Sequence, residues 1–577
     1  MDYWELRVFL HEREQELSAP FTQKELASLW SCTEKNVKRK LQLFQKQGSL
    51  SYLPGLGRGN SSSIKFHSEL EEEILSALSS FIAAKKVEEL VNMLQLPFPK
   101  TWLHPIADSI QALFGMQHSI HQKDILRSIF TRELTTLDPL DIAVTFESFL
   151  ASQLGDTLLK YDAESDGIAA HTVHHWRAEN NDTKFTLYLR KRILFHHGLE
   201  MTSKDVLFTL KRFQKSPSPY KWMLKDVKHV TAVSPYIIEI ELGSPDPFFL
   251  RYLTEKTFII LPHDREFAEN EWIASGPFRL KEYTESKLVL LANEAYFDKS
   301  PLLDGVEFWR MPRETARELT FDLDNGKEYK KRSTQQEIET GFRFIGLNMK
   351  GNKWMKNPDF RRALYHLMDA KKMWRDLEIK EKLIGASTYF YWLGHLLPVI
   401  QKSEEQLLYH LEKSGYNGEK LTLYSLPFQD SQEQAIWLIT QAARHGIQFE
   451  HHLYELSDLY TQKLGLEADA ALSGEVASSD PLLSFIGAFH NEALLFKQFI
   501  DEDHLAVIQQ MIQRMKSVSL KEDQQKVMLE IETYIQEHCL YIYTHHPLKK
   551  RSFHPMIREI ASGSYGYPDL CKLWISR

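Results

Sequence analysis

Residues 22–48 read TQKELASLWSCTEKNVKRKLQLFQKQG and contain two helix-start patterns separated by a tight break. Thr22–Glu25 and Ser31–Glu34 both have the S/T-x-x-E form of a capping box, in which two side chains satisfy free backbone N–H groups. Gly48 is suited to ending the second helix. The pattern predicts a helix-turn-helix, and the inner face of its second helix is expected to hold apolar residues at i, i+4 and i+7: Val37, Leu41 and Phe44.

The second helix also carries a basic face. Between residues 24 and 66, eight Lys and Arg residues stand against two Glu, a local net charge of +6 in a chain whose net charge is −8. Such an excess is typical of a contact with the DNA phosphate backbone, although a lysine run alone more often only keeps a helix face solvated. The residues expected to contact DNA here, with Asn36 as the candidate for reading a base, are Lys35, Asn36, Lys38, Arg39 and Lys40.

A glycine-rich turn follows at residues 54–60, PGLGRGN, between the strand-like runs 50–53 and 63–66. Two such runs around a turn predict a β-hairpin, the wing of a winged helix. Arg58 and Asn60 are expected at its tip, within reach of a minor groove or of phosphates. The turn is not a P-loop, because no Gly-Lys-Ser/Thr follows it.

At 577 residues the chain is too long for one core. We expect three parts: a winged helix over 1–67, a helical connector over 68–125, and a mixed α/β sensor over 126–577. The sequence has no run of about 18 apolar residues, which argues against a membrane span. It begins with acidic rather than basic residues, and its three widely spaced cysteines give no disulfide framework. We therefore expect a cytoplasmic protein without a membrane partner.

Motifs of the sensor region occur in a fixed order between residues 137 and 369. They include Leu137-Asp138-Pro139, the run from Phe185 to Val206, Ser275-Gly276-Pro277-Phe278, Phe344–Asn348 and Asp359–Asp369. This order resembles that of the peptide/nickel class (family 5) of extracellular solute-binding proteins. Together with the winged helix, whose glycine turn fits as well, the chain resembles the SgrR-like family of sugar-phosphate-stress regulators over nearly its whole length.

The resemblance implies a multidomain protein: an α+β winged helix followed by a two-lobed α/β domain of the periplasmic-binding-protein type (type II). It also implies hinge crossings near residues 341 and 545 and a small molecule bound between the lobes. In peptide-binding relatives, an aspartate shortly before the equivalent of Asp480-Pro481 anchors the ligand's amino terminus. Ala477 stands at that position, and a methyl group cannot bind an ammonium group.

Glu475 lies two residues earlier, on the same face of an extended segment, and could substitute for the missing aspartate. Otherwise the ligand is expected to be uncharged or anionic, for example a sugar or phosphosugar, held by aromatic rings and polar groups. Core packing is the competing explanation for each aromatic residue, and solvation for the arginine. The candidate ligand contacts are Trp272, Trp354, Arg362, Tyr389, Trp392 and Glu475.

Catalytic patterns are absent, so we expect neither an enzyme nor a cofactor. His171, His174 and His175 adjoin a strand, where three side chains do not share one face, and no metal site is expected. The preferred interpretation is a transcription regulator that binds an operator and senses a solute. The alternatives are the solute receptor of an ABC transporter, for a peptide or another small solute, and an enzyme with a helical cap. Operator, sign of regulation and oligomeric state stay open.

Overall fold

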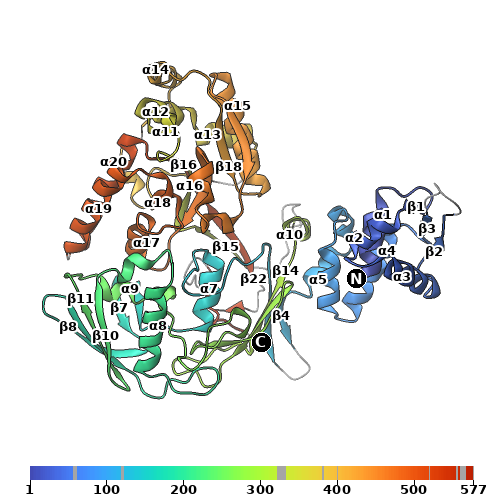
Figure 1. Ribbon diagram of the computed structural model, residues 1–577, viewed down its shortest axis with the longest axis horizontal. Coiled ribbons are helices and arrows are strands. Elements are labelled where there is room, and N and C mark those ends of the chain that lie inside the picture. Colours follow the sequence, from blue (N-terminus) through green and yellow to red (C-terminus); the bar gives the residue numbers. More distant parts are fainter. Residues whose placement is uncertain are drawn as a thin grey trace.

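The computed structural model describes residues 1–55, 62–118, 123–320, 333–379, 383–398, 400–518, 520–553, 557–558 and 567–575. Arg58 and Asn60, expected at the tip of the wing, lie outside these residues. Two lobes form the body of the molecule, and the amino-terminal helices extend to one side of it (Figure 1). None of the helices in the described ranges is long and apolar enough to cross a bilayer.

The amino-terminal part is a winged helix with an antiparallel sheet in the order β1-β3-β2. Its core is closed by side chains from every helix, including Leu10, Leu26 and Leu41, all fully buried. The elements are α1 (Asp2–His11), β1 (Ser18–Phe21), α2 (Gln23–Leu29), α3 (Glu34–Lys46), β2 (Ser51–Leu53) and β3 (Ser62–Lys65).

The first expected capping box is confirmed: Thr22 Oγ1 accepts from the Glu25 N–H, and the Glu25 carboxylate accepts from the Thr22 N–H. The second was placed wrongly. Ser31 has a φ of 45° in the tight turn, and Thr33 is the residue that caps α3, accepting from the Asn36 N–H. Gly48 adopts a φ of +75° just after α3, as expected for a helix stop.

The connector contains α4 (Leu70–Ala83), α5 (Val87–Leu94), the 3-10 helix η1 (Lys100–Ile106) and α6 (Ala107–Gln111). Its core also takes in Val8 of α1 and Trp309 and Met311 of the first lobe. β4 (Gly115–His118) and β5 (Asp124–Phe130) already belong to the first lobe's sheet. The sensor therefore begins near Gly115, ahead of the expected boundary at residue 126, which falls inside β5.

The first lobe holds two larger sheets and the two-stranded sheet of β6 (Leu159–Asp162) and β7 (Gly167–Ala170). One of the larger sheets has the order β12-β13-β14-β5-β4, with β14 parallel to β5, and the other has the order β10-β11-β9-β8. The strands are β8 (Val173–Glu179), β9 (Lys184–Leu189), β10 (Val227–Ser234), β11 (Ile237–Leu242), β12 (Phe278–Tyr283), β13 (Lys287–Ala292) and β14 (Gly305–Arg310). Its helices include α7 (Thr145–Leu154), α8 (Ser203–Lys215), α9 (Phe249–Tyr252) and α10 (Arg313–Thr320).

The second lobe is built on one sheet in the order β17-β21-β16-β20-β18-β19. The strands are β16 (Gly341–Leu347), β17 (Ile384–Gly385), β18 (Leu421–Ser425), β19 (Phe449–Leu453), β20 (Ala470–Val476) and β21 (Tyr541–His546). Its main helices are α12 (Pro358–Leu367), α14 (Glu404–Ser414), α15 (Gln429–Arg444), α17 (Pro481–Ala488), α19 (Glu502–Ser517) and α20 (Lys521–His538).

Two antiparallel strands, β15 (Ser333–Ile338) and β22 (Leu548–Phe553), lie where the chain passes between the lobes. The crossings fall at residues 339–340 and at Pro547, next to those expected at 341 and 545, and the Glu339 N–H donates to the Pro547 carbonyl at 2.9 Å. Residues 567–575 then return to the first lobe, where Tyr567 stacks on Phe149 with ring centroids 4.8 Å apart.

Candidate DNA-binding face and interlobe cleft

The outward face of α3 is basic. Lys35, Arg39 and Lys46 are exposed at i, i+4 and i+11, and so share one side of the helix, opposite the buried Val37 and Leu41. Asn36 and Lys38 are exposed at the two edges of that side. Helical spacing alone would have identified Lys46, which was not among the candidate contacts.

Lys40 differs from the other expected DNA contacts. Its ammonium group forms an ion pair with Asp2 of α1 and lies 4.9 Å from the centre of the Trp30 ring. The reason is its position three residues after the buried Val37, which directs the side chain toward α1 instead of outward. Lys40 is therefore an internal contact of the winged helix.

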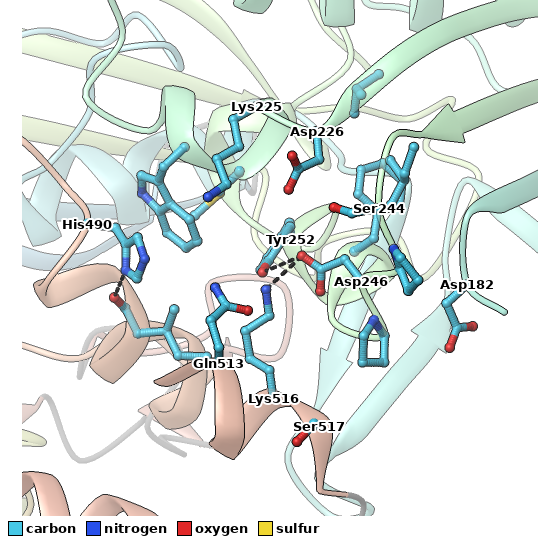
Figure 2. Close-up of a pocket in the computed structure, with 18 of the residues that line it drawn as sticks. Asp182, Lys225, Asp226, Ser244, Asp246, Tyr252, His490, Gln513, Lys516 and Ser517 are labelled. Atoms are coloured by element: carbon cyan, nitrogen blue, oxygen red, sulfur yellow. Dashed lines mark hydrogen bonds and ion pairs between the residues drawn. The ribbon is translucent and has the colours of Figure 1, made fainter. Parts of the chain in front are cut away.

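Cavities between the two lobes are candidate ligand sites. The outer one, about 440 Å³, lies between residues 181–252 of the first lobe and 486–517 of the second (Figure 2). An inner cavity of about 330 Å³ continues into one of about 70 Å³, because both are lined by Ala143, Thr145, Glu475, Val476 and Leu494. We call these two the inner cleft.

The inner cleft has a guanidinium group on its wall. Arg343, on β16, lines it beside Phe344, and its register partner on β20 is Gly474. A Cβ at position 474 would come within 2.7 Å of Arg343 Cδ and Nη1, so only glycine leaves the arginine where it lies. Arg343 also pairs with the buried Glu339 at 3.1 Å.

Two carboxyl groups in the inner cleft have raised pKa values. Both keep part of their surface open to the cavity while protein surrounds them, and burial raises the pKa of Glu475 to about 8 and that of Glu255 to about 7. Burial and the nearby Arg343 lower the pKa of His545 to about 3. Near neutral pH, His545 is therefore uncharged, Glu475 is mostly protonated, and Arg343 carries a positive charge.

Of the expected ligand contacts, Glu475 lines the inner cleft. Tyr389 is fully buried behind it, against Phe342, and its hydroxyl acts to lower the pKa of Glu475. Trp392 is half-buried and stacks on Phe390 at 4.5 Å. Because it is buried behind Glu475, Tyr389 supports the wall of the cleft and does not line it.

Three other expected contacts lie elsewhere. Trp272 is buried in the core of the first lobe, where its Nε1 donates to the Leu137 carbonyl at 3.0 Å. Trp354 is buried at the far side of the second lobe, and its Nε1 donates to Glu419 at 2.9 Å. Arg362 lies on α12 within 3.8 Å of Asp359. Their partners explain their positions, and none of the three lines the outer cavity or the inner cleft.

The Asp480-Pro481 motif joins the lobes. Asp480 is 1 % exposed, accepts from the Leu483 N–H to cap α17, and receives two hydrogen bonds from Arg251 of the first lobe. Ala477 is buried beside it. A second cross-lobe pair lies in the outer cavity, where Lys516 Nζ is 2.7 Å from Asp246 (Figure 2). These two ion pairs therefore connect the lobes, one through Arg251 and one through Asp246.

Histidines in the described ranges form no metal-binding group: no cluster of three or more His, Cys, Asp or Glu residues is arranged to hold a metal ion. His171 is buried, with its Nε2 2.7 Å from Asp156. The pKa of Asp156 is lowered by this contact, against the effect of burial.

This combination defines a class: a winged helix joined through a helical connector to a two-lobed solute-binding fold. Residues 168–493 match the family model described as bacterial extracellular solute-binding proteins, family 5, and the chain belongs to that family. Residues 4–112, from α1 through α6, match the model described as the N-terminal part of a sugar transport-related sRNA regulator, which makes the chain SgrR-like.

Relatives agree with this organisation. Protein YhjP of Bacillus subtilis, described as uncharacterized, is 28 % identical over 96 % of this chain and 95 % of its own length. The HTH-type transcriptional regulator SgrR of Photorhabdus laumondii is 27 % identical over 63 % of this chain, and the alignment spans 64 % of that regulator. The chain thus matches just under two thirds of the regulator's length.

Solved structures share the fold of the sensor. The periplasmic binding protein DppA of Helicobacter pylori, in complex with the peptide STSA, superposes with a TM-score of 0.69 at 17 % identity, over 78 % of this chain and 98 % of that one. The oligopeptide-binding protein AppA of Bacillus subtilis, in complex with a nonapeptide, gives 0.68 at 19 % identity, over 78 % and 99 %. The two-lobed fold is therefore shown.

Proposed function

We propose that this protein is a DNA-binding transcription regulator whose two-lobed domain senses a small molecule and thereby controls binding to an operator. One observation supports this most: the core of the connector takes in Val8 of the winged helix at one end and Trp309 and Met311 of the first lobe at the other. A close-packed core transmits displacement, because it cannot deform continuously. A ligand that binds the closed lobes more tightly than the open ones would shift the winged helix.

The ligand we propose is an uncharged or anionic solute, for example a sugar or phosphosugar. Arg343 offers a positive charge to the inner cleft, while Glu475 and Glu255 are uncharged or partly so near neutral pH and can donate hydrogen bonds. Ala477 provides no carboxylate for a peptide's amino terminus. Glu475, once ionised, would be the group that accepts an ammonium ion instead.

The decisive experiment starts from the full chain. In vitro selection of DNA fragments yields an operator, and fluorescence anisotropy then measures affinity with and without each of glucose, glucose 6-phosphate and glucuronate. Operator affinity that changes with one of these solutes supports the proposal, and native mass spectrometry of the purified protein identifies any solute already bound. Failure of the chain to select any DNA would contradict it.

A second candidate is a receptor of an ABC transporter, because the sensor shares its fold with DppA and AppA, whose structures contain peptides. A receptor must be exported, whereas we propose that this protein stays in the cytoplasm. Cell fractionation separates the two: recovery outside the cytoplasm favours the receptor. Enzymatic activity receives no support, since the matched families are binding and regulatory proteins.

A further inference from the structure

Helix α10 lies between the first lobe and the connector (Figure 1). Ala316 and Leu319, on one face of the helix, are buried in the connector's core. Thr315 Oγ1 donates to the Leu94 carbonyl of α5 at 3.3 Å, and Glu318 lies 2.9 Å from His104 of η1. A displacement of α10 must therefore move α5 and η1.

The other face of α10 contacts the second lobe. Arg313 Nη2 is 3.3 Å from Asp430, in the first turn of α15, and its guanidinium lies 4.3 Å from the centre of the Phe428 ring. Arg317 donates to the Gln429 side chain. Arg313 also lines the inner cleft. One short helix thus meets the cleft, the second lobe and the connector.

These cross-lobe contacts are suited to being broken. Arg313 and Asp430 are 51 % and 63 % exposed, and ion pairs at such exposure contribute little stability. Rotation of the second lobe about the hinge would carry Asp430, Phe428 and Gln429 away from α10. The buried face of α10 would stay packed against the connector. Two arrangements of α10 follow, one for each state of the lobes.

We propose that α10 is the element through which the separation of the lobes reaches the connector and the winged helix, with Arg313 and Arg317 as its coupling residues. This inference rests on the proposed function, since it assumes that lobe closure controls DNA binding. It predicts that loss of the two arginine contacts makes operator affinity insensitive to the separation of the lobes.

The test opens the lobes without a ligand. Lys516→Glu replaces the cross-lobe pair of Figure 2 by two like charges, because Asp246 then faces a carboxylate. Lys526→Glu is the matched control: it removes a Lys–Asp pair with the same charge change, but within α20. Small-angle scattering measures the opening as a rise in the radius of gyration. If Lys516→Glu alone does not raise it, Arg251→Glu is added to every variant to break the second cross-lobe pair as well.

Operator affinity is measured for the full chain in four forms: parent, Lys516→Glu, Arg313→Gln/Arg317→Gln, and the combination. We expect opening to change affinity at least about 5-fold in the parent and less than about 2-fold once both arginines are replaced. An equal change in both backgrounds overturns the role of α10. If opened lobes leave the parent's affinity unchanged, the proposed control by lobe closure fails instead, and the inference fails with it.

Discussion

The guanidinium of Arg343 lies against Gly474 on the neighbouring strand, at a distance that a side chain at 474 would not permit. This pair brings a positive charge to the wall of the inner cleft, next to carboxyl groups that are mostly or partly uncharged near neutral pH. Substitutions at Arg343 and Gly474 can therefore test whether the bound solute is anionic.

Replacing Arg343 by glutamine is expected to weaken binding of an anionic solute by about 10- to 100-fold. A hydrogen bond to a charged group contributes about 1.5–3 kcal/mol, and 1.4 kcal/mol is tenfold in affinity. Calorimetry with glucose 6-phosphate and glucose is the measurement, and the parent should prefer the phosphate. Arg362→Gln, on α12, is the control; an equal loss for both solutes contradicts the prediction.

Gly474→Ala should reproduce that loss while Arg343 is still present. The added Cβ would lie 2.7 Å from Arg343 Cδ, so the flexible side chain must turn out of the cleft. Because the contact is made by a flexible chain and not by backbone, the unfolding midpoint should change little. Binding that survives in Gly474→Ala would show that Arg343 does not hold the solute.

The stability of the second lobe should depend on pH through Glu475. Its pKa of about 8 in the folded protein exceeds the ordinary 4.5, so the folded state binds more protons between these values. The resulting stabilisation is fully present below about pH 4.5 and is lost as pH rises through 8. Urea unfolding midpoints from pH 5 to 9 should fall less steeply in Glu475→Gln than in the parent.

The urea midpoint of Glu475→Gln should still fall between pH 5 and 9, because Glu255 and Glu532 also have pKa values raised to about 7 by burial. Glu71→Gln, a change at an exposed carboxylate on α4, serves as the control and should leave the parent's slope intact. Identical slopes in Glu475→Gln and the parent would contradict the assignment of the cleft carboxyl.

The winged helix was largely predictable because its signals are local. A capping box, an apolar stripe at 3.6-residue spacing and a glycine stop each depend on a few neighbouring residues. The misplaced cap at Ser31 shows the limit: the S/T-x-x-E pattern does not reveal that the turn needs a left-handed residue there, and Thr33 caps instead. The contact of Lys40 with Asp2 could not be foreseen, because Asp2 is distant in sequence.

The sensor's fold was predictable from ordered motifs, but its cleft was not. Trp272 and Trp354 are of a residue type that often stacks on ligands. Only the tertiary structure shows that both are packed in cores, where each Nε1 donates a hydrogen bond to a protein group. Arg343 and Glu255 reach the same cleft from strands and loops of different lobes. No spacing within the sequence encodes that approach, because the hinge geometry creates it.

DNA binding should depend on the outward side of α3 and not on Lys40. Arg39→Ala and Lys46→Ala are expected to weaken operator binding and to reduce the slope of log affinity against log salt by about 1 each. Anisotropy titrations at several salt concentrations measure both. Lys40→Ala is the control within the same helix, because its ammonium pairs with Asp2; an effect as large as that of Arg39→Ala would place Lys40 on the DNA.

Arg7 should decide whether the winged helix and the connector move together. Its side chain is fully buried, pairs with Glu14, donates to the Ser68 carbonyl at 2.8 Å and lies 3.9 Å from the centre of the Phe66 ring. Glu73 of α4 lies 3.6 Å from Arg7. Arg7→Met is expected to lower the local stability by about 3–5 kcal/mol, because it removes the cation that pairs with the largely buried Glu14 carboxylate.

Native-state hydrogen exchange is the appropriate measurement, because it reports the local stability of each helix separately. Arg13→Met, which removes a pair with Glu25 at the surface, should cost at most about 1 kcal/mol and serves as the control. Equal losses in the two variants contradict the structural role of Arg7. Loss of protection in Arg7→Met that extends from α1 into α4 and α5 would mean that reader and connector open as one unit, as transmission from the lobes to DNA requires.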